Sequence, residues 1–357
     1  MPETMHAAVV EEFGRPLLIK SVPVPEPDHD EVLIRVVACG VCHTDLHAAD
    51  GDWPVKPHLP FIPGHEVAGV VSRLGRDVDN LHVGDRVGVA WLHDACLACE
   101  YCETGWETLC EHQHNTGYSC DGGFAQYVVA RAQFVAKLPD NLDFGPAAPI
   151  LCAGVTAYKG LKETEARPGQ WVAVSGVGGL GHMAIQYAKA MGLRVAAIDV
   201  APEKLELATN LGADLAVDAH MPDATAKIVA ATGGGAHGVL VTAVSRPAFA
   251  ASLEIVRRRG TVVLVGLPPG EFPVPIFDVV LKRLTLRGSI VGTRRDLDEA
   301  LDFAARGDVK AEIATVPLAE VNRVLADLKA GHISGRVVLD PTAQGLSGHA
   351  RKEAAAA

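Results

Sequence analysis

Residues 171–199, WVAVSGVGGLGHMAIQYAKAMGLRVAAID, decide the fold of this chain. An apolar run at 171–175 predicts a strand, a glycine-rich turn follows it, and residues 182–191 have the apolar spacing of a helix. A second apolar strand at 194–198 ends in Asp199. A glycine pattern alone is a weak signal, but between a strand and a helix it is typical of a dinucleotide-binding turn.

The glycines of this turn have separate expected roles. We expect Gly176 to form the tight turn, Gly178 to let a pyrophosphate approach the backbone, and Gly181 to let the helix pack on the strand. The turn residues predicted to bind the cofactor are Gly176, Gly178, Gly179, Leu180 and Gly181.

Asp199 indicates which nicotinamide dinucleotide binds. A carboxylate here accepts hydrogen bonds from the adenosine ribose of NAD and repels the additional phosphate of NADP. Residues 200–202 include no arginine to receive that phosphate. Lys204 is a further candidate for the ribose, although a lysine at this place is by default a solvated helix residue. The sequence therefore favours NAD over NADP.

Strand and helix signals alternate through residues 154–291, which predicts an α/β domain with a doubly wound parallel sheet. About the first 150 residues instead show short strands with frequent turns, typical of a mainly β domain. The elements after residue 292 exceed what one dinucleotide domain needs. We therefore predict one domain over 1–153 and 292–357, to which the candidate zinc ligands described below belong, and an NAD-binding domain over 154–291. Six strands are expected in the latter, at 171–175, 194–198, 215–217, 238–243, 261–265 and 284–291.

Length and charge limit the function. A chain of 357 residues suits two domains, and a net charge of −11 argues against nucleic-acid or anionic-membrane partners. No apolar stretch is long enough to span a bilayer, and residues 1–10 lack the features of a secretory signal. We expect a soluble, cytoplasmic protein.

Two short segments, CHTDLH at 42–47 and PGHE at 63–66, concentrate ligands that zinc prefers. A catalytic zinc needs three protein ligands and an open fourth position. Cys42 and His65 would supply two. Cys152 is the best candidate for the third, because the other cysteines are clustered elsewhere or unaccompanied. The alternative is that these are small buried cysteines and a core histidine, which each residue on its own would favour.

Four cysteines, Cys96, Cys99, Cys102 and Cys110, are spaced closely enough to enclose one tetrahedral zinc with no open position. An iron–sulfur cluster is the main competitor, but the last cysteine comes late and precedes Glu111 rather than proline. A nucleic-acid zinc ribbon is disfavoured by the acidic neighbours. Metal-bound thiolates in a reducing compartment explain these cysteines better than disulfides.

In combination, CGVCHTDLH at 39–47, GDWP at 51–54, GHE at 64–66, the four cysteines and the glycine turn resemble the zinc-dependent medium-chain alcohol dehydrogenases. The similarity is greatest to their tetrameric yeast and bacterial branch and covers nearly all of the chain except its C-terminal tail. It implies a GroES-like fold for the mainly β domain and a Rossmann fold for the other. It also implies NAD(H), two zinc ions per subunit and a homotetramer.

The resemblance also implies roles at the zinc. Cys42, His65 and Cys152 match the catalytic ligands, and Glu66 matches a nearby carboxylate that tunes the site or replaces a ligand. Asp45 matches the residue that orients the histidine ligand.

The implied reaction interconverts small primary alcohols and aldehydes by hydride transfer. Thr44 and His47 match a proton relay from the alcohol through a ribose hydroxyl to solvent. Trp53 and Trp91 match bulky residues that narrow the alcohol pocket. These tryptophans are alternatively core or interface aromatics.

Further cofactor contacts are implied away from the glycine turn. His43 and Arg336 match contacts to the pyrophosphate. Arginine is also found in the family at the position of His43, and an imidazole at this position would hold NAD less tightly than a guanidinium. Arg336 is alternatively a surface residue. Residues 289–291 and Val265 match the backbone around the nicotinamide carboxamide. The implied contacts outside the turn are His43, Thr156, Lys204, Val244, Val265, Ser289, Val291 and Arg336.

Three other interpretations of the function remain open. A quinone or enoyl reductase would share the nucleotide fold but has no use for the zinc ligands. A polyol or formaldehyde–glutathione dehydrogenase would keep the zinc and widen the pocket. A non-catalytic nucleotide-binding protein would leave Thr44 and His47 unexplained.

Overall fold

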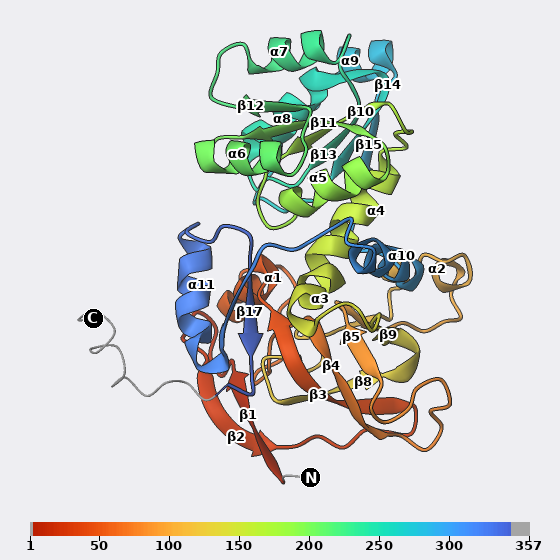
Figure 1. Ribbon diagram of the computed structural model, residues 1–357, viewed down its shortest axis with the longest axis vertical. Coiled ribbons are helices and arrows are strands. Elements are labelled where there is room, and N and C mark those ends of the chain that lie inside the picture. The colour runs from red at the N-terminus through yellow and green to blue at the C-terminus, as the bar shows by residue number, and fades with distance from the viewer. Residues whose placement is uncertain (1–2, 344–357) are drawn as a thin grey trace, which may run out of the picture. The chain divides into compact units, whose positions relative to one another are not determined.

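A computed structural model describes residues 3–343 of the chain (Figure 1). It divides into a first unit, Met1–Leu151 with Ile313–Ala357, and a second unit, Cys152–Glu312. The predicted domain boundaries assigned 152–153 and 292–312 to the first domain. The structure groups these residues with the second unit, because helix α10 (Arg294–Ala305) packs on helix α4 (Val155–Glu163). The part of the prediction that covers 344–357 lies outside the described residues.

The first unit is built on a seven-stranded sheet, as expected of a mainly β domain. Its order is β16-β17-β3-β4-β5-β9, with β8 also pairing with β3. All pairs are antiparallel except β16 with β17. Two small sheets, β1-β2 and β6-β7, complete it. The strands are β1 (Thr4–Val9), β2 (Leu18–Pro23), β3 (Glu31–Gly40), β4 (Glu66–Leu74), β5 (Arg86–Val89), β6 (Leu92–Asp94), β7 (His114–Asn115), β8 (Tyr127–Arg131), β9 (Ala136–Lys137), β16 (Ile313–Pro317) and β17 (Arg336–Asp340).

The core of the first unit lies along β3 and β4. Val32, Ile34, Val36 and Val67 are fully buried, and the β-branched side chains suit the pleated surface of a central strand. The helices of this unit are short: α1 (His43–Asp50), α2 (Glu100–Glu103), α3 (Phe144–Pro149) and α11 (Val321–Lys329) (Figure 1). Helix α3 packs on β3 and β4.

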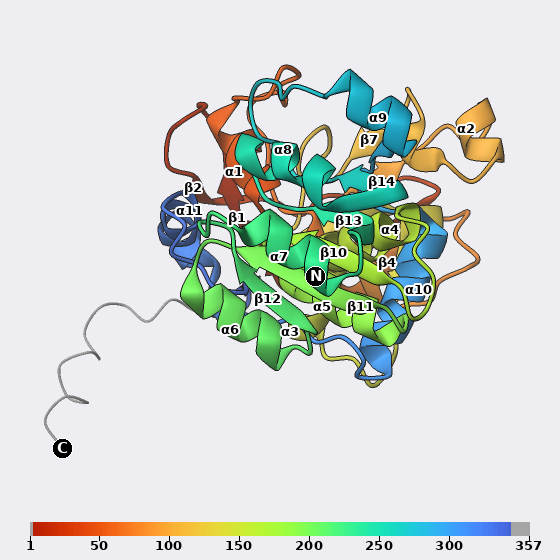
Figure 2. The same cartoon turned by 90° about the horizontal axis from the view of Figure 1, so that it is seen from above.

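The second unit contains the predicted doubly wound sheet of six parallel strands. The order is β12-β11-β10-β13-β14-β15. Helices α5 and α6 cover one face of it and α8 the other (Figure 2). The strands are β10 (Trp171–Ser175), β11 (Arg194–Asp199), β12 (Leu215–Asp218), β13 (Ala236–Val241), β14 (Val256–Leu264) and β15 (Thr285–Gly288). The helices besides α4 and α10 are α5 (Gly181–Ala190), α6 (Pro202–Asn210), α7 (Ala224–Ala231), α8 (Arg246–Ile255) and α9 (Ile276–Lys282).

Two predicted strands differ from the structure. The strand expected at 284–291 stops at Gly288, because Val291 has φ +42°, which extended backbone does not allow. In the mainly β domain, the alternating run at 124–129 also predicts a strand, but β8 begins only at Tyr127, because the backbone of Phe124 hydrogen-bonds with Pro63 and Ala8 in neighbouring segments.

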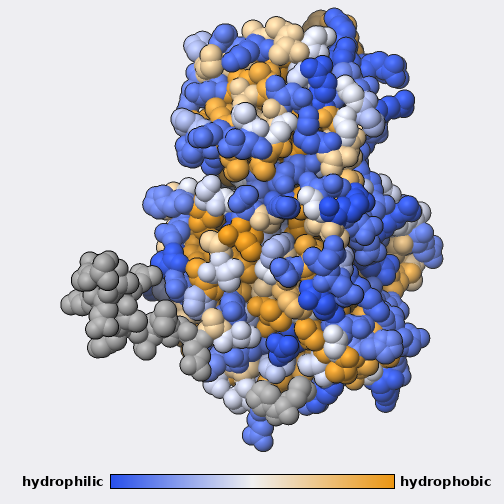
Figure 3. Space-filling model, viewed as in Figure 1, coloured by the Kyte–Doolittle hydropathy of each residue, from blue (hydrophilic) through white to orange (hydrophobic). Residues whose placement is uncertain are grey.

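Among the described residues, no helix has both the length and the apolar character needed to cross a membrane. Hydrophilic and hydrophobic side chains are interspersed on the face seen in Figure 3.

Candidate metal and cofactor sites

Helix α1 places the residues of the CHTDLH segment. Cys42 is its N-cap, and the backbone N–H of Cys42 donates to Oδ2 of Asp45 at 2.8 Å. The helix ends at Gly51, whose φ of +63° is the left-handed conformation that glycine adopts most readily. This short helix therefore has a defined start and stop around Thr44 and His47.

The structure brings the predicted zinc ligands together. One donor atom from each of Cys42, His65, Glu66 and Cys152 lies within 4.8 Å of the others, and all four residues are buried. His65 and Glu66 stand at the start of β4, and Cys152 lies in the π-helix Ile150–Gly154. Two thiols, an imidazole and a carboxylate are a donor set that fits zinc.

Asp45 fixes the orientation of His65. Oδ1 of Asp45 lies 3.0 Å from Nδ1 of His65 and also accepts the backbone N–H of Gly64. Burial lowers the pKa of His65, but Asp45 and Cys42 raise it more, so it lies well above its ordinary value. With Nδ1 facing the carboxylate, Nε2 is left to face a metal. Such a partner is typical of metal-binding histidines.

Glu66 is completely buried beside the ligand set. Burial raises the pKa of Glu66 to about 7 against the opposing charge of Arg336. Its Oε2 atom is buried and has no hydrogen-bond partner among the described residues. Gly40 provides the space, since a Cβ there would lie 1.8 Å from Oε2. An unsatisfied carboxylate oxygen beside two thiols is suited to a cation.

Arg336 and His43, the predicted pyrophosphate contacts, both belong to the first unit. The guanidinium Nη2 of Arg336 donates to Oε1 of Glu66, and the arginine is 4% exposed, so it is not a surface residue. Burial lowers the pKa of His43, and Arg336 lowers it further, although Cys42 opposes this. Their contact with pyrophosphate stays a prediction.

His47 is held from two sides. Both carboxylate oxygens of Asp52 lie 3.0 Å from its Nδ1 atom, and its ring stacks on Trp53 with centroids 5.4 Å apart. Thr44 Oγ1 lies 3.7 Å from Sγ of Cys42, close to the ligand set. Asp52 was not predicted as the partner of His47, because its only signal in the sequence is its spacing of five residues from that histidine.

Aromatic rings form a continuous group beside the ligand set. The ring of Trp91 meets His65 edge-on at 5.3 Å, and Trp53 and Trp91 meet at 6.5 Å. Tyr118 contacts both tryptophans, at 5.7 and 5.5 Å, and its hydroxyl donates to the carbonyl of Val55. Tyr118 was not predicted, because nothing local in its sequence distinguishes it from a core aromatic.

The four clustered cysteines also converge. Their donor atoms lie within 4.8 Å of one another, and Sγ of Cys102 lies 3.6 Å from that of Cys99 and 4.0 Å from that of Cys96. Two hydrogen bonds, one with the backbone of Ala98 and one with the side chain of Cys110, lower the pKa of the Cys96 thiol to about 6. Around a tetrahedral zinc, sulfurs lie roughly 3.8 Å apart, as bond lengths of about 2.3 Å require. The group fits a closed zinc site.

The glycine turn of the second unit has a different constraint at each glycine. Gly176 has φ +100°. A Cβ on Gly181 would lie 1.8 Å from the carbonyl oxygen of Gly176, so the turn itself excludes a side chain there. A Cβ on Gly178 would meet nothing within 4 Å, which leaves space for a ligand beside the backbone. Helix α5 then begins at Gly181 and points its N-terminus at this space.

Asp199 ends β11 and is held by backbone N–H groups. Oδ2 accepts from Val177 at 2.7 Å, and Oδ1 accepts from Val200 at 2.8 Å and Ala201 at 3.1 Å. The carboxylate is thus fixed against the glycine turn. Lys204 lies in the first turn of α6.

The other predicted cofactor residues follow the carboxyl ends of parallel strands. Val244, Val265 and Ser289 come after β13, β14 and β15. The sheet order changes direction between β10 and β13, and ligands bind at such a switch point. The hydroxyls of Ser289 and Thr156 are buried without a hydrogen-bond partner among the described residues. Hydroxyls of this kind can hydrogen-bond with the polar groups of a dinucleotide bound at the carboxyl edge of the sheet.

Comparisons with known proteins cover both units. The alcohol dehydrogenase GroES-like domain matches residues 28–140, and the zinc-binding dehydrogenase domain matches residues 179–306. An alcohol dehydrogenase of Rhizobium meliloti (strain 1021) is 61% identical over 337 residues, which is 94% of this chain and 99% of that protein.

Solved structures agree with this assignment. The alcohol dehydrogenase of the archaeon Aeropyrum pernix is 35% identical with a TM-score of 0.87, covering 94% of this chain and 100% of its own. An acetophenone reductase from Geotrichum candidum, solved with NAD, is 30% identical with a TM-score of 0.85, covering 95% and 99%. Because identity at this level extends through both units, the chain belongs to the zinc-dependent medium-chain alcohol dehydrogenases.

Proposed function

We propose that this protein interconverts small primary alcohols and aldehydes by hydride transfer to or from NAD(H), with zinc held at Cys42, His65 and Cys152. The main support for this proposal is the buried set of two thiols, an imidazole and a carboxylate, whose donor atoms lie within 4.8 Å of one another. The alcohol dehydrogenases to which the chain is similar support the alcohol and aldehyde substrates.

Zinc in this site supplies a Lewis acid that lowers the pKa of an alcohol hydroxyl, and NAD supplies the hydride acceptor. The protein holds the site in shape. Cys42 and Cys152 provide thiolate charge, Asp45 keeps Nδ1 of His65 occupied, and Glu66 adds a carboxylate that Arg336 restrains.

The alcohol proton needs a route to solvent. In the proposed relay Thr44 takes it and passes it through a ribose hydroxyl of NAD to His47, and the distance of 3.7 Å from Thr44 Oγ1 to Sγ of Cys42 supports this role. His47 is partly exposed, and its Nδ1 faces the half-exposed carboxylate of Asp52, so Nε2 is the nitrogen left to receive the proton. A histidine can carry this proton at neutral pH.

The aromatic group, defined as Trp53, Trp91 and Tyr118, supports the proposed preference for small substrates. Trp91 lies against the ligand His65 and Trp53 against the relay His47. Rigid indoles on this side favour flat or short substrates over branched ones.

The fixed carboxylate of Asp199 supports NAD over NADP, because it would face the additional phosphate of NADP. The converging thiols of Cys96, Cys99, Cys102 and Cys110 support a second, structural zinc. None of the eight cysteines, all of which lie within residues 3–343, is in a disulfide, which supports the proposed reducing, cytoplasmic compartment.

Helix α9 supports the proposed homotetramer. Ile276, Phe277, Val280 and Leu281 are each at least 66% exposed, and the neighbouring β15 is an edge strand of its sheet. An exposed apolar patch of this kind marks an interface, and we propose that a second copy covers it. Sedimentation of wild type and Phe277→Asp tests this: the variant should dissociate, and an unchanged assembly would contradict it.

The direct test of the reaction is NADH formation from a panel of alcohols by the zinc-loaded enzyme. Ethanol should be oxidised faster than a bulky secondary alcohol, and a flat aromatic aldehyde should be reduced. Faster turnover of the bulky alcohol would contradict the proposed substrate size. Binding of NAD without any turnover would contradict the reaction itself.

A further inference from the structure

The first unit has a second pocket whose residues have no part in the proposed reaction. It is an open pocket of about 440 Å³ lined by residues of β1, β2, β6 and β8, by Glu31 at the start of β3, and by the loops at 25–26, 60–62 and 120–122. This volume is within the range of small-molecule sites. None of the predicted zinc ligands, relay residues or cofactor contacts lines it.

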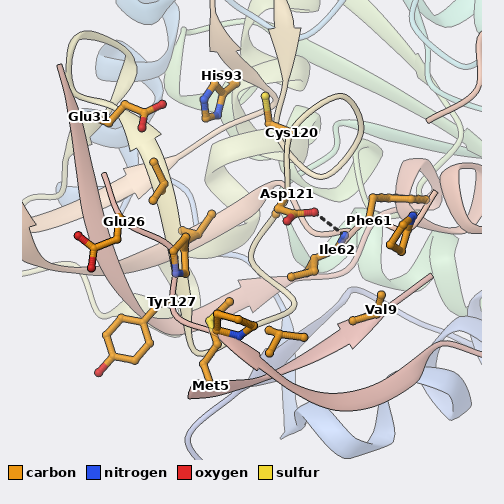
Figure 4. A pocket seen from close by; sticks show the side chains of 17 residues that line it. Met5, Val9, Glu26, Glu31, Phe61, Ile62, His93, Cys120, Asp121 and Tyr127 are labelled. Carbon is orange, nitrogen blue, oxygen red and sulfur yellow. Dashed lines mark hydrogen bonds between the residues drawn. The ribbon is translucent and has the colours of Figure 1, made fainter. Parts of the chain in front are cut away.

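The pocket has a polar end and an apolar end. Figure 4 shows Glu31, His93 and Cys120 grouped at one end, and Met5 and Val9 at the other. Asp121 lies between these groups, and its Oδ1 accepts the backbone N–H of Ile62 at 2.9 Å. A ligand that fills this space must itself be amphiphilic.

His93 is the strongest sign of a ligand. It is only 6% exposed, yet its Nδ1 atom is buried and has no hydrogen-bond partner among the described residues. Leaving such a nitrogen unsatisfied costs about 1–3 kcal/mol. Burial lowers the pKa of His93, although Asp94 and Glu31 oppose this, so the ring is neutral at pH 7. In the tautomer that carries the ring proton on Nε2, Nδ1 is a hydrogen-bond acceptor.

The surrounding charges select a cation. Glu26, Glu31 and Asp121 bring three carboxylates to the pocket. Arg73 pairs with Glu26 at 2.9 Å. Oε2 of Glu31 already accepts the N–H of Asp28, which leaves Oε1. The positive charge of Arg131 also reaches His93, but Asp30 holds its guanidinium at 2.8 Å. An anionic ligand would meet repulsion here, whereas a donor with positive charge would satisfy both acceptors.

A metal ion is a poorer match. Within the described part of the chain, only two groups of side chains are close enough together to hold a metal, and neither includes His93, Glu31 or Cys120. An organic cation, which needs no such close approach of three ligands, fits the wider spacing.

We propose that this pocket binds a primary ammonium ion on a short hydrocarbon chain, with the ammonium between His93 and Glu31 and the chain against Met5, Val9 and Phe61. The three N–H donors of the ammonium match these two acceptors. The apolar end takes the methylenes. The site acts independently of the alcohol site.

Calorimetry of the zinc-loaded enzyme at pH 7 tests the proposal with n-hexylammonium, hexanoate and hexyl methyl ether. One n-hexylammonium should bind per chain, and the other two should bind at least about tenfold more weakly, as loss of a charge-assisted hydrogen bond requires. Equal binding of hexanoate or the ether would overturn the proposal.

Two variants locate the binding. Glu31→Gln, which keeps the shape of the side chain, should weaken n-hexylammonium about tenfold. Cys42→Ser, a matched control at the predicted catalytic zinc, should leave the affinity unchanged. Binding lost in Cys42→Ser and retained in Glu31→Gln would place the amine on the zinc and overturn the proposal.

A second measurement needs no variant. With methyl-labelled methionine, the Met5 resonance should shift on addition of n-hexylammonium, while that of Met183, which is buried in the second unit, should not. A Met5 resonance unmoved at about 10 mM, enough to fill a site of millimolar Kd, would overturn the proposal.

Discussion

Nδ1 of His65 lies 3.0 Å from Oδ1 of Asp45, and both side chains are 1% exposed. The same carboxylate accepts N–H groups from Cys42 and Gly64, so it joins the segment at 42–45 to the segment at 64–65. Asp45 thus holds one ligand by its ring and another by its backbone.

The first prediction concerns this carboxylate. Asp45→Asn should reduce zinc affinity at the catalytic site about 10–100-fold, because the amide no longer provides the charge that fixes the His65 tautomer. Competition with a chelator measures the affinity. Asp52→Asn, which alters the partner of His47 instead, should leave it unchanged. Equal zinc retention in Asp45→Asn and wild type would contradict this role.

The second prediction separates two glycines of the dinucleotide turn. Gly181→Ala should destabilise the protein by about 1–3 kcal/mol, because the new Cβ would lie 1.8 Å from the Gly176 carbonyl oxygen. Gly178→Ala should leave stability unchanged but raise the Kd for NAD about tenfold or more, since its Cβ enters the open space proposed for the pyrophosphate. Thermal unfolding and NAD titration measure the two effects. An unchanged Kd for NAD in Gly178→Ala would contradict the binding of pyrophosphate beside this glycine.

The third prediction concerns Tyr118, which touches both tryptophans of the aromatic group. Tyr118→Leu should raise the kcat/KM ratio of a bulky secondary alcohol to ethanol about tenfold, because the indoles lose the ring that supports them. Tyr118→Phe keeps the ring and should change the ratio less than about twofold. Steady-state kinetics with both alcohols measure the ratio. A similar change in both variants would show that the ring does not set substrate size.

The fourth prediction concerns stability and pH in the second unit. Asp296 is buried, and burial raises its pKa, but hydrogen bonds from Lys162 and Thr293 lower it below the ordinary value of 3.8. A depressed pKa stabilises the fold above pH 3.8, and this contribution is lost as the pH falls through the lower folded value.

Asp296→Asn should therefore reduce the free energy of unfolding by about 1–3 kcal/mol at pH 7, and less below pH 3.8. Denaturant unfolding across this range measures the difference. Asp302→Asn, on the exposed side of the same helix, should change stability by no more than about 0.5 kcal/mol. A difference for Asp296→Asn that grows on acidification would contradict the sign.

The sequence predicts features that depend on local pattern. The six-stranded sheet followed from the apolar runs, and the glycine turn from its position between a strand and a helix. Helix α1 was not expected, because its eight residues HTDLHAAD lack an apolar period and only the capping contacts around Asp45 define it.

Contacts between residues that are far apart in the sequence could not be predicted from local pattern. Glu66 and Arg336 are 270 residues apart, and the arginine was expected to contact pyrophosphate rather than a carboxylate. Tyr118 reaches Trp53 and Trp91 only through the fold of the first unit. Cys152 was selected by elimination and by resemblance, since its local sequence offers no second ligand.

The most direct measurement of the central claim is zinc content per chain together with alcohol oxidation for wild type and Cys152→Ser. We predict two zinc ions in the wild type and one in Cys152→Ser, with the fold intact and alcohol oxidation lost, because the four-cysteine site is separate. Two zinc ions and unchanged oxidation in Cys152→Ser would contradict the account.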